Sequence, residues 1–162
     1  MTASAALAET AGAIMTRRVV TLTPDDTVPA IAAKLAQHAI SAAPVVDHGG
    51  EVVGMVSEDD LMRRFGAAAQ SRSNWWLNLL AEGEQLAPEF LDYIRLDRRR
   101  AAELMTRPVV AVAESMPVAE IADLLMKKHI KRVPVLRGGK LVGIVSRADI
   151  VRAMARTPVQ AK

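Results

Sequence analysis

The octapeptide Ala-Ile-Met-Thr-Arg-Arg-Val-Val, residues 13–20, returns about 90 residues later as Glu-Leu-Met-Thr-Arg-Pro-Val-Val, residues 103–110. Further along, Gly-Met-Val-Ser at 54–57 is matched by Gly-Ile-Val-Ser at 143–146, and Asp60 then corresponds to Asp149. So many matches in the same order indicate an internal duplication. A single repeat of roughly 50 residues is marginal for a stable core, so we expect the two copies to pack against each other.

Each repeat has the same expected order of elements, which is clearest in the second. A Val-rich strand leads to a helix, then to two strands joined by a Gly-Gly hairpin, and then to a second helix. We expect a strand at 109–112, a helix from near Pro117, strands at 133–136 and 141–145, and a helix from Ser146. The predicted fold class is therefore α/β (α+β): two β-α-β-β-α repeats packed with pseudo-two-fold symmetry.

The duplication also divides the chain into segments. We expect an N-terminal tail at 1–11, repeat 1 at 12–66, a helical insert at 67–100, repeat 2 at 101–156 and a C-terminal tail at 157–162. The insert contains Trp75 and Trp76. These aromatics could seal the insert against the repeats or a second subunit, or could form an exposed docking patch for a partner.

The composition excludes several classes of protein. The chain has 162 residues and no Cys, so it can hold no disulfide, thiolate zinc site, Cys nucleophile or iron–sulfur cluster. Its formal net charge of +3 is uneven, because residues 101–162 contain 11 Lys and Arg against 5 Asp and Glu. That C-terminal third should attract anions, although many of its cations can simply form a solvated helix face.

The first 15 residues are rich in Ala, but they lack a basic flank and contain Glu9, which is untypical of an export signal. No apolar run approaches the roughly 20 residues that span a bilayer. We therefore expect a cytoplasmic protein without a membrane partner.

The candidate site chemistry lies where the last strand of each repeat meets a helix. Ser57 and Ser146 each precede an aspartate by three residues, Asp60 and Asp149. A helix N-terminus with a serine suits a phosphate, and the aspartate can accept from two ribose hydroxyls, which together would grip a nucleoside phosphate. The same Ser-x-x-Asp spacing also resembles a capping box that merely finishes a helix. The repetition does not decide between these interpretations, because a duplicated fold also duplicates its caps.

Taken together, the repeated motifs resemble the tandem cystathionine β-synthase (CBS) domain pair, or Bateman module, of the small bacterial stand-alone type. They are Met-Thr-Arg before the first strand, Ile-x-x-x-Pro-Val, the Gly hairpin and Gly-x-Val-Ser-x-x-Asp, and the resemblance covers about residues 12–66 and 101–156. It implies a non-enzymatic regulatory module. Such a module binds AMP, ADP or ATP, or NAD or S-adenosylmethionine, between its repeats, forms a homodimer and signals to an effector protein.

The resemblance also implies two ligand-binding clefts, each built from both repeats. The first would combine Thr16, Val20, Ile40 and Ser41 with Ile144, Ser146 and Asp149. The second would combine Thr106, Val110, Ile130, Lys131 and Arg132 with Met55, Ser57 and Asp60. Apolar members would sandwich adenine, the aspartates would hold ribose, and the threonines, serines and basic groups would hold phosphate.

The two clefts are expected to differ in charge. Lys131 and Arg132 stand where repeat 1 has Ser41 and Ala42, and charge-assisted contacts should favour ligands with more phosphate. We expect the neighbouring Glu58 and Asp59 to point outward, unless Mg²⁺ accompanies a polyphosphate ligand.

Other functions find less support in the residues. No catalytic constellation is present, and the three histidines lack the spacing of a metal site. The basic run Arg98–Arg100 invites a nucleic-acid interpretation, but acidic neighbours surround it and no nucleic-acid-binding motif accompanies it. The alternatives that remain open are a ligand-free scaffold that acts through the aromatic insert, and nucleic-acid binding by the basic C-terminal part.

Overall fold

The computed structural model describes residues 8–62 and 97–156. They form two compact units, and each unit combines segments that are distant in sequence. Of the described residues, unit 1 contains 8–19, 49–52 and 108–156, and unit 2 contains 20–48, 53–62 and 97–107. Trp75, Trp76 and most of the predicted helical insert lie outside the described residues, as do both ends of the chain.

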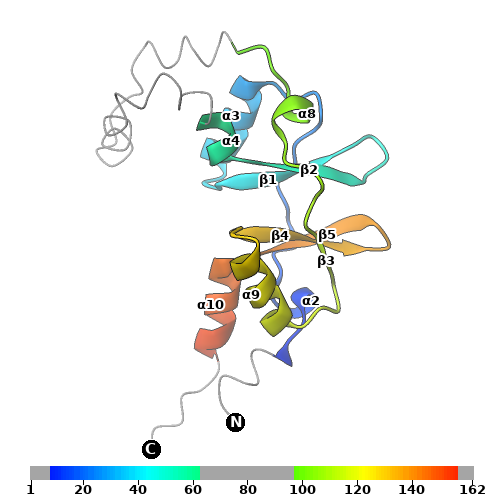
Figure 1. The fold of residues 1–162 in the computed structure, drawn as a ribbon, viewed down its shortest axis with the longest axis vertical. Coiled ribbons are helices and arrows are strands. Elements are labelled where there is room, and N and C mark those ends of the chain that lie inside the picture. Colours follow the sequence, from blue (N-terminus) through cyan, green and yellow to red (C-terminus); the bar gives the residue numbers. More distant parts are fainter. Residues whose placement is uncertain (1–7, 63–96, 157–162) are drawn as a thin grey trace, which may run out of the picture. The chain divides into compact units, whose positions relative to one another are not determined.

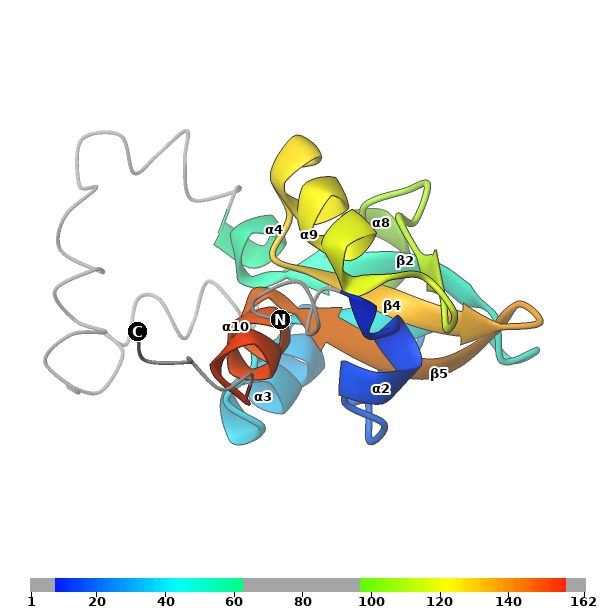
Figure 2. The ribbon, with the colours of Figure 1, turned by 90° about the horizontal axis from the view of Figure 1, so that it is seen from below.

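Unit 1 is a three-stranded sheet with helices on one face (Figures 1 and 2). The strands lie in the order β3-β4-β5, with β3 parallel to β4 and β4 antiparallel to β5. Helix α10 contacts α9, α2 and β5. The elements are α2 (Ala11–Ile14), β3 (Val112–Ala113), α9 (Val118–Lys127), β4 (Arg132–Arg137), β5 (Lys140–Ser146) and α10 (Arg147–Arg156).

Unit 2 repeats this plan around the paired strands β1 and β2. Leu22 lies in parallel register with Val45 of β1, at the place that β3 takes beside β4 in unit 1. The helices of unit 2 lie on one face of its strands (Figure 1). The elements are α3 (Val28–Gln37), β1 (Ala42–Val46), β2 (Val52–Ser57), α4 (Glu58–Met62) and α8 (Ala101–Leu104).

The mixed α/β fold predicted from the sequence is confirmed, and so is the hairpin between β4 and β5. Arg137 pairs with Lys140, so Gly138 and Gly139 form a two-residue loop. Both glycines have positive φ, 56° and 79°, as a tight hairpin with the twist of its strands requires.

The predicted strand at 109–112 was wrong in extent. Only Val112 and Ala113 pair with β4, as β3. The run of valines favours an extended backbone, but pairing with a neighbouring strand is decided by tertiary contacts, and only Val112 and Ala113 have partners in β4.

The core of each unit lies between its sheet and the apolar stripe of one helix, α9 in unit 1 and α3 in unit 2. In α9 the buried residues are Val118, Ile121 and Leu125, and in α3 they are Val28, Ile31 and Leu35. Their spacing of three and four residues is the helical period that the sequence shows. Pro117 caps the start of α9, close to the predicted position.

Helices α3 and α9 end in the same left-handed turn. Ala39 has φ 50°, and the following Ile40 donates its N–H to the Leu35 carbonyl (3.0 Å). This is a Schellman motif, whose left-handed position is most often glycine. His129 and Ile130 take the same two places after α9, and both isoleucines pack against the core of their unit.

Replacing Ala39 with glycine is expected to raise the free energy of unfolding by about 0.5–1 kcal/mol, because glycine adopts this conformation without a Cβ clash. For a chain of this size the melting temperature should rise by about 1–4 °C. Ala36→Gly, on the exposed face inside α3, is the matched control and should lower the melting temperature. Calorimetry that finds equal losses for both variants would contradict the assignment of strain to Ala39.

Candidate functional site

The candidate site in each unit is the point where the last strand of the repeat meets its helix. In unit 1, Asp149 Oδ2 accepts from the backbone N–H (2.8 Å) and the hydroxyl (2.9 Å) of Ser146. In unit 2, Asp60 Oδ2 accepts from the same two groups of Ser57 (2.8 and 3.0 Å). Both aspartates are buried, 8% exposed for Asp60 and 6% for Asp149. We call these two arrangements the Ser–Asp ends.

The Ser–Asp ends are capping boxes, so the structural interpretation of the motif applies to both. The cap uses the Oδ2 atom of each aspartate. In unit 1 the Asp149 Oδ1 atom forms an ion pair with Arg152, whose side chain is 69% exposed. The pair joins an exposed guanidinium to a carboxylate whose side chain is 6% exposed, so a ligand hydroxyl that replaced the arginine would have to satisfy a buried charged oxygen in its place.

Each Met-Thr-Arg motif has a structural explanation that the sequence alone did not provide. Met15 packs over Gly143, where a Cβ would lie 2.7 Å from the methionine Cγ. Arg17 donates to the Gly12 carbonyl (3.2 Å) and so satisfies an acceptor at the end of α2. The arginine of the motif thus stabilises the short helix α2, and its methionine packs on β5, the strand that leads into a Ser–Asp end.

The second copy of the motif repeats these contacts in unit 2. Met105 packs over Gly54, and Arg107 donates to the Ala102 carbonyl of α8 (2.8 Å). The sequence contains one signal for this contact, because both repeats have a Met and a Gly at matching positions. Their spacing along the chain, however, does not show that the two residues touch.

The threonine of each motif pairs with a strand residue that the sequence analysis assigned to the same cleft. Thr16 and Ile144 exchange two backbone hydrogen bonds (2.9 and 3.0 Å), and Thr106 and Met55 do the same (2.8 and 3.4 Å). Both threonines are exposed. The backbone therefore holds two hydroxyl-bearing side chains close to the strands that lead into the Ser–Asp ends.

Lys131 and Arg132 lie beside the Ser–Asp end of their own repeat. The Arg147 N–H donates to the Lys131 carbonyl (3.0 Å), and Arg132 is the register partner of Ser146 across β4 and β5. The sequence grouped these two basic residues with Ser57 and Asp60 instead. Since that grouping joins residues of different units, it stays a prediction, while the neighbours within unit 1 are Ser146 and Asp149.

The same holds for Ser41, which the sequence grouped with Ser146 and Asp149. In unit 2 its carbonyl accepts from the Glu58 N–H (2.8 Å), next to Ser57 and Asp60. Glu58 and Asp59 are exposed. Each unit therefore contains a Ser–Asp end and a residue beside it, which is Lys131 in unit 1 and Ser41 in unit 2.

The remaining predicted apolar residues are half-buried: Val20, Ile40, Val110, Ile130, Met55 and Ile144. Three of them, Ile40, Ile130 and Val110, pack against the core of their own unit. Core packing is thus enough to explain why these three residues are apolar. Their contact with adenine stays a prediction.

The basic run Arg98–Arg100 is partly used inside unit 2. Arg99 forms a bidentate pair with Asp97 (2.7 Å), and Arg100 donates to the Asp25 carbonyl (2.8 Å). Two of its three guanidinium groups therefore serve the fold, and the ion pair with Asp97 neutralises one of the charges that this run could offer a nucleic acid.

In residues 8–62 and 97–156, no group of three or more His, Cys, Asp and Glu side chains is arranged to hold a metal ion. Within the same residues, no helix is both long enough and apolar enough to cross a membrane.

Comparison with known proteins identifies the family. The family model described as "CBS domain" matches residues 11–67 and again 101–156. The chain belongs to the CBS domain family. Its two matched segments make it a tandem CBS pair, as the repeated motifs predicted.

Relatives and solved structures agree with this assignment. The chain is 29% identical over 142 residues to the uncharacterized protein MK0525 of Methanopyrus kandleri, with 87% of this chain covered, and it spans 60% of that relative's length. The CBS domain of a CBS domain-containing membrane protein from Sphaerobacter thermophilus is 34% identical, with a TM-score of 0.70. The match covers 93% of this chain and 91% of that one.

Two similar CBS pairs have been solved with adenosine compounds. CBSX2 from Arabidopsis thaliana in complex with AMP is 25% identical, with a TM-score of 0.69 and coverage of 91% of this chain and 96% of that chain. The CBS pair of protein MJ0100, in complex with 5′-methylthioadenosine and S-adenosyl-L-methionine, is 25% identical, with a TM-score of 0.65. That match covers 89% of this chain and 98% of the other.

Proposed function

We propose that this CBS pair is a regulatory module that binds an adenosine-containing ligand and changes its contact with an effector protein in response. The observation that carries the proposal is the pair of Ser–Asp ends, each a buried carboxylate at the start of a helix. Similar CBS pairs bind AMP, or 5′-methylthioadenosine and S-adenosylmethionine. The ligands to consider are AMP, ADP, ATP, NAD and S-adenosylmethionine, with Mg²⁺ accompanying a polyphosphate.

The role of each residue type follows from its chemistry. A carboxylate accepts hydrogen bonds from vicinal ribose hydroxyls, which Asp60 and Asp149 would do. Exposed Thr16 and Thr106 would donate to phosphate, and the half-buried Met55 and Ile144 would offer apolar surface to adenine. A ligand regulates only through its different affinity for two arrangements of the protein, so the effector would sense that shift.

The module is proposed to be non-catalytic, cytoplasmic and homodimeric. Three large apolar side chains are exposed on adjacent helices of unit 1: Met126 (67%), Val151 (63%) and Met154 (44%). A second copy of the chain could cover these side chains.

Thermal unfolding with added ligand tests the proposal. A ligand at about 100 times its dissociation constant should stabilise the protein by roughly 2.7 kcal/mol, a rise of about 5–11 °C in melting temperature. Mass spectrometry of small molecules released from the purified protein would identify a ligand that co-purifies. If no adenosine compound shifts the melting temperature and none is released, a ligand-free scaffold replaces the sensor as the preferred function.

A further inference from the structure

Within the described residues, the large apolar side chains that stay exposed all belong to two contacting helices of unit 1. They are Met126 of α9 and Val151 and Met154 of α10. Val151 and Met154 follow the exposed Arg147 at intervals of four and three residues, so these three side chains lie along one side of α10. We call them the α10 stripe. It begins with a cation and continues with apolar surface that is open to solvent.

Unit 2 has a stripe of opposite charge at the corresponding place. Glu58 and Met62 of α4 take the positions that Arg147 and Val151 have in the α10 stripe, and four residues separate them too. Glu58 is exposed and Met62 is half-buried. We call these two side chains the α4 stripe. The helix in contact with it, α3, has the exposed Ala36 where α9 has its exposed methionine, so the surface beside the α4 stripe carries a small side chain in place of a large one.

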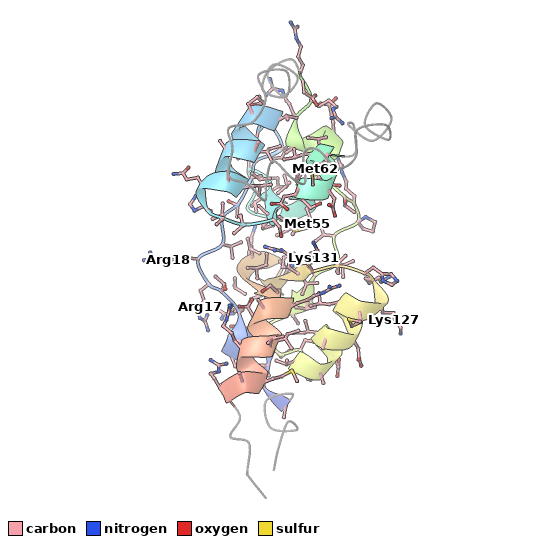
Figure 3. All side chains as sticks on the ribbon, turned by 90° about the vertical axis from the view of Figure 1, so that its left-hand side faces the viewer. Arg17, Arg18, Met55, Met62, Lys127 and Lys131 are labelled. Atoms are coloured by element: carbon pink, nitrogen blue, oxygen red, sulfur yellow. The ribbon has the colours of Figure 1, made fainter. Side chains whose placement is uncertain are left out.

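The two units differ in net charge in the same sense as the two stripes. Of the described residues, unit 1 contains 11 Lys and Arg against 6 Asp and Glu, and unit 2 contains 5 against 8. Lys127 at the end of α9 is exposed (Figure 3), and so is Asp59 in the first turn of α4. Two α10 stripes would therefore repel each other, whereas an α10 stripe and an α4 stripe attract.

We infer that the α10 stripe is the surface on which a second copy of this chain docks its α4 stripe, so that unlike surfaces meet in the dimer. This inference rests on the homodimer proposed above and specifies which surfaces meet in it. In a dimer with two-fold symmetry a contact between unlike surfaces occurs twice, once from each copy. Each copy then covers the exposed Val151 and Met154 of the other and places its Glu58 near the other's Arg147. A dimer of like surfaces would instead bring Arg147 of both copies together, and repulsion disfavours that arrangement.

Cross-linking between introduced thiols tests which surfaces meet. The chain has no cysteine, so Val151→Cys and Ala36→Cys each provide a single thiol, one in each unit. Both side chains are exposed, so the fold should be preserved, and circular dichroism melting checks this. A bismaleimide should join the two variants covalently after they are mixed and allowed to exchange subunits, and it should join neither variant to itself in comparable yield. Self-linking of either variant at the yield of the mixture, or no linking in any sample of a dimeric protein, overturns the inference.

Charge exchange between the stripes tests the electrostatic argument. Arg147→Glu gives the α10 stripe the charge of the α4 stripe, and Glu58→Arg does the reverse. Either change alone makes the two stripes alike at both contacts of the dimer, so its dissociation constant in analytical ultracentrifugation should rise at least about tenfold. The combined variant again pairs opposite charges and should return to within about threefold of the natural value. Added salt should weaken the natural dimer.

The outcomes separate this inference from the function on which it rests. In a dimer of like surfaces, Arg147→Glu only replaces one repulsion by another, so an unchanged dissociation constant overturns the inference while the homodimer stands. A natural chain that sediments as a monomer overturns both the inference and the homodimer. Ligand binding is measured separately, by the thermal shift described above, and neither result changes it.

Discussion

Gly54→Ala is expected to lower the free energy of unfolding by about 1–3 kcal/mol, the usual cost of forcing extra volume into a packed site. A Cβ at this position would lie 2.6 Å from Met105 Cγ and 2.7 Å from Met105 Cβ. A methionine can swing its thioether away, but its Cβ is fixed to the backbone. The segment would therefore have to move, and Thr106 would lose its pairing with Met55. The melting temperature should fall by about 2–12 °C.

A double-mutant cycle separates this clash from other causes. If the clash explains the loss, adding Gly54→Ala to Met105→Gly, which removes the methionine Cβ as well, should cost almost nothing further. Gly143→Ala is the internal comparison, because its Cβ would lie 3.0 Å from Met15 Cβ, slightly farther than in unit 2. It should be the milder of the two substitutions. Additive losses in the cycle would show that Met105 is not what makes glycine necessary here.

The order of elements could be predicted from the sequence because it depends on local physics. The apolar spacing of α9, the proline at its start and the paired glycines at 138 and 139 each determine structure within a few residues. The extent of β3 could not be predicted in this way, since pairing with β4 depends on where two distant segments meet. The same limit explains why the contacts of Met15 and Met105 were not foreseen.

In the candidate site, too, local features could be predicted from the sequence and contacts between distant segments could not. The Ser-x-x-Asp spacing predicted both a cap and a possible ligand contact, and the structure forms the cap in both units. Lys131, just before β4, and Arg147, the first residue of α10, are joined by one backbone hydrogen bond. No local sequence pattern predicts that bond. Sequence reasoning therefore predicted the two caps but could not tell which residues lie next to them, and the binding roles of the site residues stay a prediction.

Asp149→Asn is expected to separate the two roles of the buried aspartate. The amide oxygen can still accept from the Ser146 N–H and hydroxyl, so the free energy of unfolding should stay within about 1 kcal/mol of the natural value. The amide has no charge and a weaker acceptor for ribose hydroxyls. We therefore expect at least about a tenfold loss of affinity for the ligand that the thermal assay identifies, since bonds to charged groups contribute about 1.5–3 kcal/mol.

Asp149→Ala should lose both functions at once. Without the carboxylate the start of α10 loses its cap, which costs about 0.5–2 kcal/mol, and the ligand-dependent rise in melting temperature at that end should disappear. Ser146→Ala, which leaves the Ser146 backbone N–H bonded to Asp149, is the matched control for the cap.

Arg152→Gln provides the control for the ion pair at Asp149 Oδ1. Because Arg152 is exposed but its partner carboxylate is buried, its removal should lower stability modestly, and it should strengthen ligand binding if the arginine competes with ribose for that oxygen. Titration calorimetry of Asp149→Asn and Arg152→Gln on the same ligand then isolates the charge of the aspartate. Ser146→Ala is compared by its melting temperature only, because the serine hydroxyl is itself expected to hold phosphate. Natural affinity in Asp149→Asn would mean that Asp149 is only a helix cap, and the ligand would have to be held by other residues.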